Sequence, residues 1–200
     1  MPALLNRETM NKAHKEWYSR GYLPHFDHPG KVQMITFRLA DALPSEIIMQ
    51  LEQEVKRGKD HHQQKRRRVE AHLDAGLGSC CLRDPRLARL VEDALLHFDH
   101  QRYRLCAWVV MPNHVHALLE TWSSYPLPEV IHSWKSFTAN QANRLLRRSG
   151  QLWQAEYFDR YMRDARHFRT AFNYIHHNPV KAGLVLVAED WPFSSARRNQ

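Results

Sequence analysis

Four segments of the chain have the residue pattern of β-strands. Residues 31–39 alternate apolar and polar side chains from Ile35 onward, so one face of this strand is predicted to be buried. Met111-Pro112-Asn113 is a turn sequence between two apolar segments, which predicts a hairpin. The predicted strands span residues 31–39, 103–110, 114–121 and 157–163.

Apolar residues recur at helical spacing in four other segments. Asp84 and Pro85 form a strong start signal, because aspartate caps a helix N-terminus and proline fits its first position. Asn178-Pro179 is predicted to end the last helix, since proline cannot donate the next backbone hydrogen bond. The predicted helices begin at Pro44-Ser45-Glu46 and at Asp84, and span residues 126–148 and 165–177.

The order of these elements predicts an α+β fold. Without the extra pieces it is a split β-α-β-β-α-β pattern, as in ferredoxin-like antiparallel sheets with helices packed on them. Residues 1–30 are interpreted as an N-terminal arm, interrupted by Pro24 and Pro29-Gly30, and residues 31–200 as a single domain. The polar stretch at about 59–83, with its run Lys65-Arg66-Arg67-Arg68, is interpreted as a basic, exposed insertion.

Composition narrows the class of protein. The 200 residues carry a formal net charge of +8, which favours a polyanionic partner, although a solvated basic surface would have the same charge. The 3 cysteines include no CxxC pair, so a reduced, cytoplasmic protein without a structural zinc finger is expected. No segment has the ~18 continuous apolar residues of a membrane span, and no signal peptide is predicted.

Candidate chemistry begins with His114 and His116 on the second strand of the hairpin. Residues two apart in a strand point to the same side, so both imidazoles leave one face. Imidazole is a common metal ligand, and two from one strand make half a metal site. A pair of surface histidines on a half-exposed sheet is the alternative interpretation.

The last helix supplies further polar groups. Tyr174 and Asn178 are four residues apart and share one helix face. Each also has an ordinary interpretation. Tyr174 would be a half-buried aromatic residue, and Asn178 a helix-ending residue before proline.

Several separated motifs together resemble a known family. AWVVMPNHVHALL, LWQAEYFDRYMRD, YIHHNPVKAGLV and DWPFSS, within residues 31–195, resemble the REP-associated tyrosine transposases of the single-tyrosine HUH superfamily, which have an IS200-like transposase domain. The resemblance implies a ferredoxin-like or RRM-like sheet with a catalytic tyrosine on a late helix. It implies that His114 and His116 bind Mg²⁺ or Mn²⁺ and that Tyr174 is the nucleophile. Asn178 stands where related enzymes commonly have a glutamine as the third ligand.

The resemblance also implies the reaction. A metal-dependent endonuclease and strand transferase would cut single-stranded DNA at REP-type palindromic hairpins through a 5′-phosphotyrosine intermediate. A metal ion on a phosphodiester offsets the charge of the transition state, and a phenol, with a pKa of ~10, needs help to lose its proton. Tyr157 and Tyr161 are rival nucleophiles. A domesticated protein that binds the hairpins without cutting them is the alternative function.

Basic and aromatic side chains are candidate DNA contacts. A monomer is expected, nucleoid-associated when bound to DNA. Trp17, Tyr18, Tyr22 and Trp153 could stack on bases, although packing on the protein is the favoured interpretation of each single ring. The candidate phosphate contacts are Arg66, Arg67, Arg68, Lys135, Arg144, Arg147, Arg160, Arg163, Arg166 and Lys181.

Overall fold

A four-stranded antiparallel sheet forms the centre of the computed structural model, in the strand order β4-β5-β3-β6. Numbered along the chain, these are the second, third, first and fourth strands, which is the order of split β-α-β folds. The structure describes residues 14–19, 24–44, 46–47, 49 and 62–198, with only the backbone for 62–66 and 198. The strands are β3 (Val32–Arg38), β4 (Tyr103–Val110), β5 (His114–Thr121) and β6 (Phe158–Tyr161).

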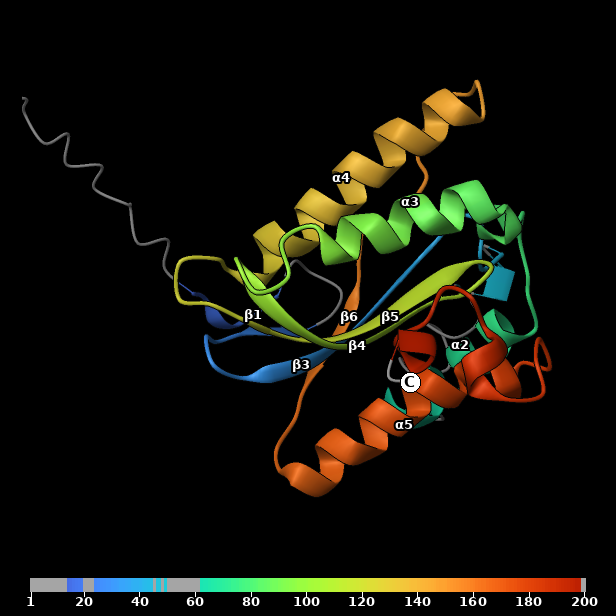
Figure 1. The fold of residues 1–200 in the computed structure, drawn as a ribbon. Helices are drawn as coiled ribbons and strands as arrows, with labels where there is room; N and C mark the ends of the chain where they lie inside the picture. The colour runs from blue at the N-terminus through green and yellow to red at the C-terminus, as the bar shows by residue number, and fades with distance from the viewer. Residues whose placement is uncertain (1–13, 20–23, 45, 48, 50–61, 199–200) are drawn as a thin grey trace, which may run out of the picture.

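Helices cover both faces of this sheet (Figure 1). Helices α3 (Pro85–Leu96) and α4 (Leu127–Leu145) lie over one face, and α5 (Ala165–Lys181) lies under the other. A further helix, α2 (His62–Asp74), lies beside the end of α5. The predicted α+β class is confirmed, with four described helices on an antiparallel sheet.

The hairpin and the helix that precedes it form as the sequence predicts. Strands β4 and β5 have the predicted bounds. The Asp84 side chain accepts a hydrogen bond from the backbone N–H of Arg86 at 2.9 Å, which caps α3. The apolar stripe of α3 then packs Leu87 and Val91 into the core.

Alternation along β5 separates two apolar clusters. Val115, Ala117 and Leu119 point to the larger core, under α3 and α4. Leu118 points to a smaller cluster, under α5, which includes Ile175. His114 and His116 have the parity of Leu118, so the sheet presents both imidazoles to the α5 side.

The predicted end of the last helix is wrong. Helix α5 continues through Asn178-Pro179 to Lys181. Proline removes only its own N–H, and the turn is completed because the N–H of Ala182 donates to the Asn178 carbonyl at 3.0 Å. Asn178 is therefore a buried residue within the helix, and not its exposed end.

The N-terminal and basic regions contain regular structure that the pattern does not predict. A two-stranded sheet joins β1 (Glu16–Ser19) to β2 (Pro24–Asp27), so the interruption expected at Pro24 is wrong. Proline is tolerated there because it is the first residue of the strand. The basic insertion contains α2, and most of the helix expected from residue 44 lies outside the described residues.

The residues after α5 pack back on the domain, as predicted. The N–H of Val110 in β4 donates to the Phe193 carbonyl at 2.9 Å, and the Ser195 hydroxyl accepts from the N–H of Trp108 at 3.0 Å. His176 of α5 makes a hydrogen bond to the same hydroxyl at 2.8 Å. Residues 191–197, called the tail below, therefore cover the outer edge of β4 and also contact α5.

Candidate active site

The imidazole of His114 is fixed by a neighbour whose orientation is itself fixed. The side-chain nitrogen of Asn113 donates to the carbonyl oxygens of Leu73 at 3.2 Å and Leu77 at 3.0 Å. The Asn113 side-chain oxygen is therefore the atom that faces His114 Nδ1, 2.7 Å away. An amide oxygen can only accept, so Nδ1 carries the proton and Nε2 carries the lone pair.

His116 is held in the same manner from the adjacent strand. Its Nδ1 and the hydroxyl of Thr36, its cross-strand partner in β3, form a hydrogen bond of 2.7 Å. The ring centroids of His114 and His116 are 4.7 Å apart, and the Nε2 atoms of both rings are buried. Both rings thus have the supporting hydrogen bond at Nδ1 that metal-binding histidines usually have.

The electrostatic environment keeps His114 neutral. Burial, followed by the positive charges of Lys181 and Arg38, lowers its pKa to about 3. The nearby side chain of Asn178 opposes this shift. At neutral pH the lone pair of Nε2 is therefore available to a cation.

Helix α5 brings the other two candidate residues to the histidines. The ring of Tyr174 lies with its centroid 5.3 Å from that of His116. Asn178, one turn further along α5, is fully buried, and neither atom of its amide has a hydrogen-bond partner. Buried polar groups are rarely left without a hydrogen-bond partner. A ligand bound to the Asn178 amide would explain why this one is. The structure therefore assembles His114, His116, Tyr174 and Asn178 into one cluster between β5 and α5.

The donor atoms suit a divalent cation. His114 Nε2 is buried without a hydrogen-bond partner, as is the Asn178 amide, and together with His116 Nε2 they give two nitrogens and one carbonyl oxygen. Within the described residues no three His, Cys, Asp or Glu side chains gather to hold a metal. The amide of Asn178 would therefore have to serve as the third protein ligand. Imidazole favours transition metals, whereas a carbonyl oxygen suits Mg²⁺ and Mn²⁺.

The rival tyrosines lie away from this cluster. Tyr161 pairs with Gln33, which has the opposite parity to Thr36 in β3, and its ring packs on Phe26 at 4.9 Å. Tyr157 is buried, with its ring 4.4 Å from that of His25. Both rings contact β2, on the side of the sheet away from α5. Among these three tyrosines, only Tyr174 adjoins the histidines.

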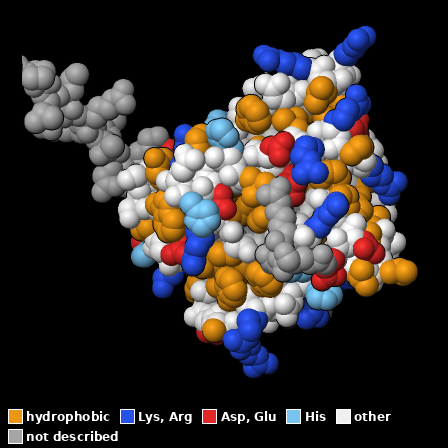
Figure 2. Space-filling model, viewed as in Figure 1, with side chains coloured by type: hydrophobic (Ala, Val, Ile, Leu, Met, Phe, Trp, Pro, Cys, Tyr) orange, Lys and Arg blue, Asp and Glu red, His pale blue; other side chains and the backbone are white. Residues whose placement is uncertain are grey.

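The predicted DNA contacts fall into several environments. Arg144 and Arg147 are exposed at the end of α4, and Arg163 and Arg166 at the start of α5, where Figure 2 shows Lys and Arg side chains projecting. Arg67 and Arg68 on α2 and Arg160 on β6 are exposed, and the side chain of Arg66 lies outside the described residues.

Both predicted lysine contacts already have protein partners. Lys135 donates to the carbonyl oxygens of Gln154 and Ala155 at 2.6 and 2.7 Å, so it anchors the segment before β6. Lys181 forms an ion pair with Asp74 at 2.7 Å. Their positive charges therefore have structural roles in addition to any contact with DNA.

The predicted stacking residues also lie in different environments. Trp17 is 61% exposed, next to the rings of Phe26 and Tyr161. Trp153 belongs to the core instead, where its Nε1 donates to the Thr138 hydroxyl at 2.8 Å. Tyr22 lies outside the described residues.

The sequence analysis missed Arg38 as a site residue. It is the last residue of β3 and pairs with His114 across the strands, so its side chain lies on the α5 side. In the sequence it is one more polar residue in an alternating strand. Only the register of β3 against β5 places it beside His114.

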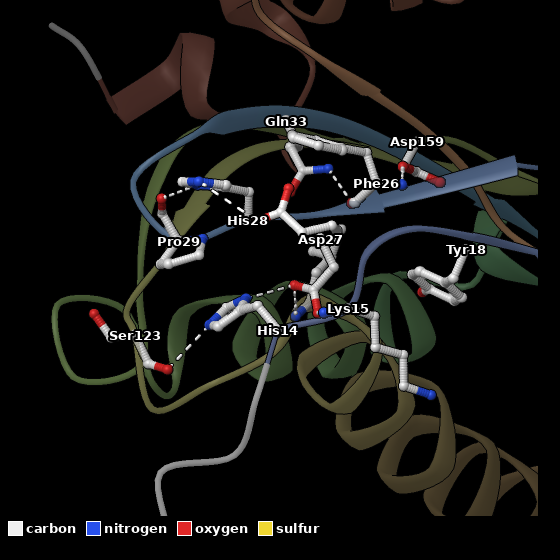
Figure 3. A network of polar contacts seen from close by, with 12 residues as sticks. His14, Lys15, Tyr18, Phe26, Asp27, His28, Pro29, Gln33, Ser123 and Asp159 are labelled. Carbon is white, nitrogen blue, oxygen red and sulfur yellow. Dashed lines mark hydrogen bonds and ion pairs between the residues drawn. The ribbon is translucent and has the colours of Figure 1, made fainter.

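A second group of polar contacts lies on the other side of the sheet (Figure 3). Asp27 is fully buried and accepts hydrogen bonds from His14 Nδ1 at 2.7 Å and from the N–H of Leu127 at 3.0 Å. His25 lies between the carboxylates of Asp159 and Glu156. These contacts hold β1 and β2 to the domain, which is a structural role. The cluster around Tyr174 is therefore kept as the candidate active site.

Comparison with known proteins shows which proteins this chain resembles. Residues 84–178, which contain both histidines, Tyr174 and Asn178, match the family model described as Transposase IS200 like. The chain is also 29% identical over 114 residues to the REP-associated tyrosine transposase of Escherichia coli K12, and 29% identical over 112 residues to its Haemophilus influenzae counterpart. The resemblance inferred from the sequence is thus confirmed.

These matches cover parts of the proteins compared. The aligned regions are 56% and 50% of this chain, and the chain spans 66% and 63% of the E. coli and H. influenzae relatives. A solved structure of a REP-associated tyrosine transposase bound to a REP hairpin has the same fold. Its TM-score is 0.57 at 18% identity, over 87% of this chain and 81% of that chain.

Proposed function

We propose that this protein is a single-tyrosine DNA transposase that cuts and rejoins single-stranded or hairpin DNA of the REP type. The observation that carries the proposal is the cluster of His114, His116, Tyr174 and Asn178 between β5 and α5. The Tyr174 side chain adjoins two buried imidazoles and a buried amide whose own atoms have no hydrogen-bond partner. The family match, the REP-associated tyrosine transposases that the chain resembles, and the similar fold of one such protein bound to a REP hairpin support the same proposal.

In this proposal each residue has a defined role. The phenolic oxygen of Tyr174 attacks the scissile phosphorus and forms a bond to the 5′ side of the DNA, as its proton passes to solvent. The 3′ oxygen leaves with a proton as a free 3′-hydroxyl. The phosphotyrosine bond conserves the energy of the phosphodiester, so a second 3′-hydroxyl can displace Tyr174 and rejoin the DNA without ATP.

A divalent metal fits the donor set and would be held by His114, His116 and Asn178. When bound, Mg²⁺ or Mn²⁺ would supply Lewis-acid polarisation of the phosphate. The hydrogen bonds that the two rings make with Asn113 and Thr36 fix their orientation, so the Nε2 atoms need no reorganisation.

The proposed partner is an anionic nucleic acid. Exposed arginines at the end of α4 and the start of α5 would track the phosphate backbone, and the exposed ring of Trp17 could stack on a base. Within the described part of the chain, no helix is long and apolar enough to cross a membrane. A monomer that is nucleoid-associated when DNA-bound remains our expectation.

The first test is adduct formation. The protein is incubated with labelled single-stranded REP-like hairpins, with Mn²⁺ or with EDTA, and the products are separated on a denaturing gel. A metal-dependent, protein-linked band should appear with the wild type and should be absent from Tyr174→Phe, which should still bind the hairpins. Tyr161→Phe is the matched control and should form the band.

Each other outcome contradicts a part of the proposal. A band that persists in Tyr174→Phe and disappears in Tyr161→Phe would show that the nucleophile is Tyr161 and not Tyr174. A native complex without cleavage products, across hairpins that vary in sequence and flank, would favour a hairpin-binding protein that does not cut.

A further inference from the structure

Arg38 lies directly across the sheet from His114, one of the candidate site residues. Directly opposed residues of antiparallel strands have Cβ atoms about 4.5–5.5 Å apart, and Arg38 is directly opposed to His114. Its charge is one of the influences that lower the pKa of His114. The guanidinium therefore faces the same space as the histidines.

This guanidinium is held in place by a neutral group. Its Nε donates to the side-chain oxygen of Gln154 at 2.6 Å. Gln154 is itself fixed, because its N–H donates to the Arg38 carbonyl at 2.9 Å and its carbonyl accepts from Lys135 at 2.6 Å. Arg38 thus has a defined orientation that does not depend on a counter-charge.

No carboxylate of the described residues lies within ion-pair distance of Arg38. Arg104 on β4 differs, because it pairs with Glu120 at 2.6 Å and is half exposed. Burial lowers the pKa of Arg38 to about 10, so it remains a cation at neutral pH and carries the cost of desolvation. An anion at the site would offset that cost.

Lys181 approaches the site from the opposite side. Its ammonium lies 5.6 Å from the centroid of the Tyr174 ring, and its charge also lowers the pKa of His114. Lys181 is already paired with Asp74, however. Arg38 is therefore the cation of this pair whose charge no described carboxylate neutralises.

We propose that Arg38 is a further catalytic residue, which donates hydrogen bonds to a non-bridging oxygen of the scissile phosphate while Tyr174 attacks. The inference rests on the function proposed above. A planar guanidinium fits two phosphate oxygens and stabilises the charge that develops on them in the transition state. Gln154 would position Arg38 without touching the DNA.

The first measurement is single-turnover cleavage with Mn²⁺, on the hairpin that the wild type cuts. Arg38→Gln should lower the rate constant about 100-fold, the size of effect found when a positioned transition-state donor is removed. Arg38→Lys keeps the charge but not the fork, and should recover part of that loss. Arg104→Gln, which removes a strand arginine already paired with Glu120, should cut at the wild-type rate.

A second measurement separates a phosphate contact from a structural role. In a Tyr174→Phe background, which prevents cleavage, hairpin affinity is compared for a normal scissile phosphate and for an uncharged methylphosphonate. With Arg38 present the neutral linkage should weaken binding about tenfold, as expected for a charge-assisted hydrogen bond. With Arg38→Gln the difference between the two hairpins should shrink, because only the contribution of the guanidinium is lost.

The outcomes separate the two proposals. If the wild type forms adducts and Arg38→Gln cuts as fast, or shows the full methylphosphonate effect, Arg38 does not contact the phosphate and only this inference fails. A lower melting temperature together with an unchanged methylphosphonate effect would assign Arg38 a structural role. If the wild type forms no adduct with any hairpin, the proposed function fails and this inference fails with it.

Discussion

Asp27 connects the N-terminal strands to the helix that covers the larger core. Its fully buried carboxylate accepts from the N–H of Leu127, the first residue of α4, at 3.0 Å. It also accepts from the N–H of Lys15 at 3.2 Å and from His14 Nδ1 at 2.7 Å (Figure 3). Asp27 therefore caps α4 from a segment 100 residues away along the chain.

The cost of removing this carboxylate follows from those contacts. Asp27→Ala leaves the N–H of the fully buried Leu127 without an acceptor, which costs about 1–3 kcal/mol. It also removes a negative charge from the N-terminus of a helix, which costs about 0.3–1 kcal/mol. Lys15 is exposed, so water can replace its partner. We expect Asp27→Ala to lower the free energy of unfolding by about 3 kcal/mol, and Asp27→Asn, which keeps an acceptor oxygen, by about 1 kcal/mol.

Urea unfolding followed by far-UV circular dichroism measures both values, provided that the slope with urea is unchanged. Asp190→Ala is the control, because Asp190 is an exposed carboxylate in a different helix. A loss below about 1 kcal/mol for Asp27→Ala would show that water satisfies the N-terminus of α4. An equal loss for Asp27→Asn would show that the charge, and not the accepted hydrogen bond, is what matters.

Two further predictions concern pH and metal. Hydrogen bonds to Asp159 and Glu156 and their charges outweigh burial and raise the pKa of His25, so its contribution to stability is complete below the unfolded pKa of 6.5 and is lost as pH rises through the folded value. The stability difference between wild type and His25→Gln in urea should therefore shrink from pH 6 to pH 9, and a constant difference would contradict the ion pairs. At one hundred times its dissociation constant, Mn²⁺ should raise the melting temperature of the wild type by roughly 5–10 °C. It should leave that of the His114→Ala, His116→Ala double variant unchanged, and an equal rise in both proteins would place the metal elsewhere.

The sequence predicts best the elements whose signals are local. The bounds of β4 and β5 follow from apolar runs around a proline turn, and the start of α3 follows from Asp84. The end of α5 does not, because the packing of Ile175 and Pro179 outweighs the one hydrogen bond that proline removes. Strands β1 and β2 have only four residues each, too few for a clear alternation.

In the candidate site, too, local spacing is predicted from the sequence and long-range contacts are not. The spacing of His114 and His116, and of Tyr174 and Asn178, places each pair on one face, but their proximity depends on the packing of α5 against the sheet. The position of Arg38 beside His114 depends on strand register, for which a single sequence contains no local signal. The supporting contact from Thr36 is missed for the same reason.

The path of the chain before and after α5 has a consequence for the reaction. The helix follows β6, at one edge of the sheet, and leads into the tail, which lies along β4 at the other edge. Tyr174, the proposed nucleophile, is therefore tethered at both ends to the sheet that carries the histidines. A tether of this kind gives the reacting groups a high effective concentration and pays the entropy of their encounter when the protein folds. His114, His116, Tyr174 and Asn178, the residues of the proposed centre, thus lie in one polypeptide, and α5 could exchange with another copy only if one edge of the sheet were released.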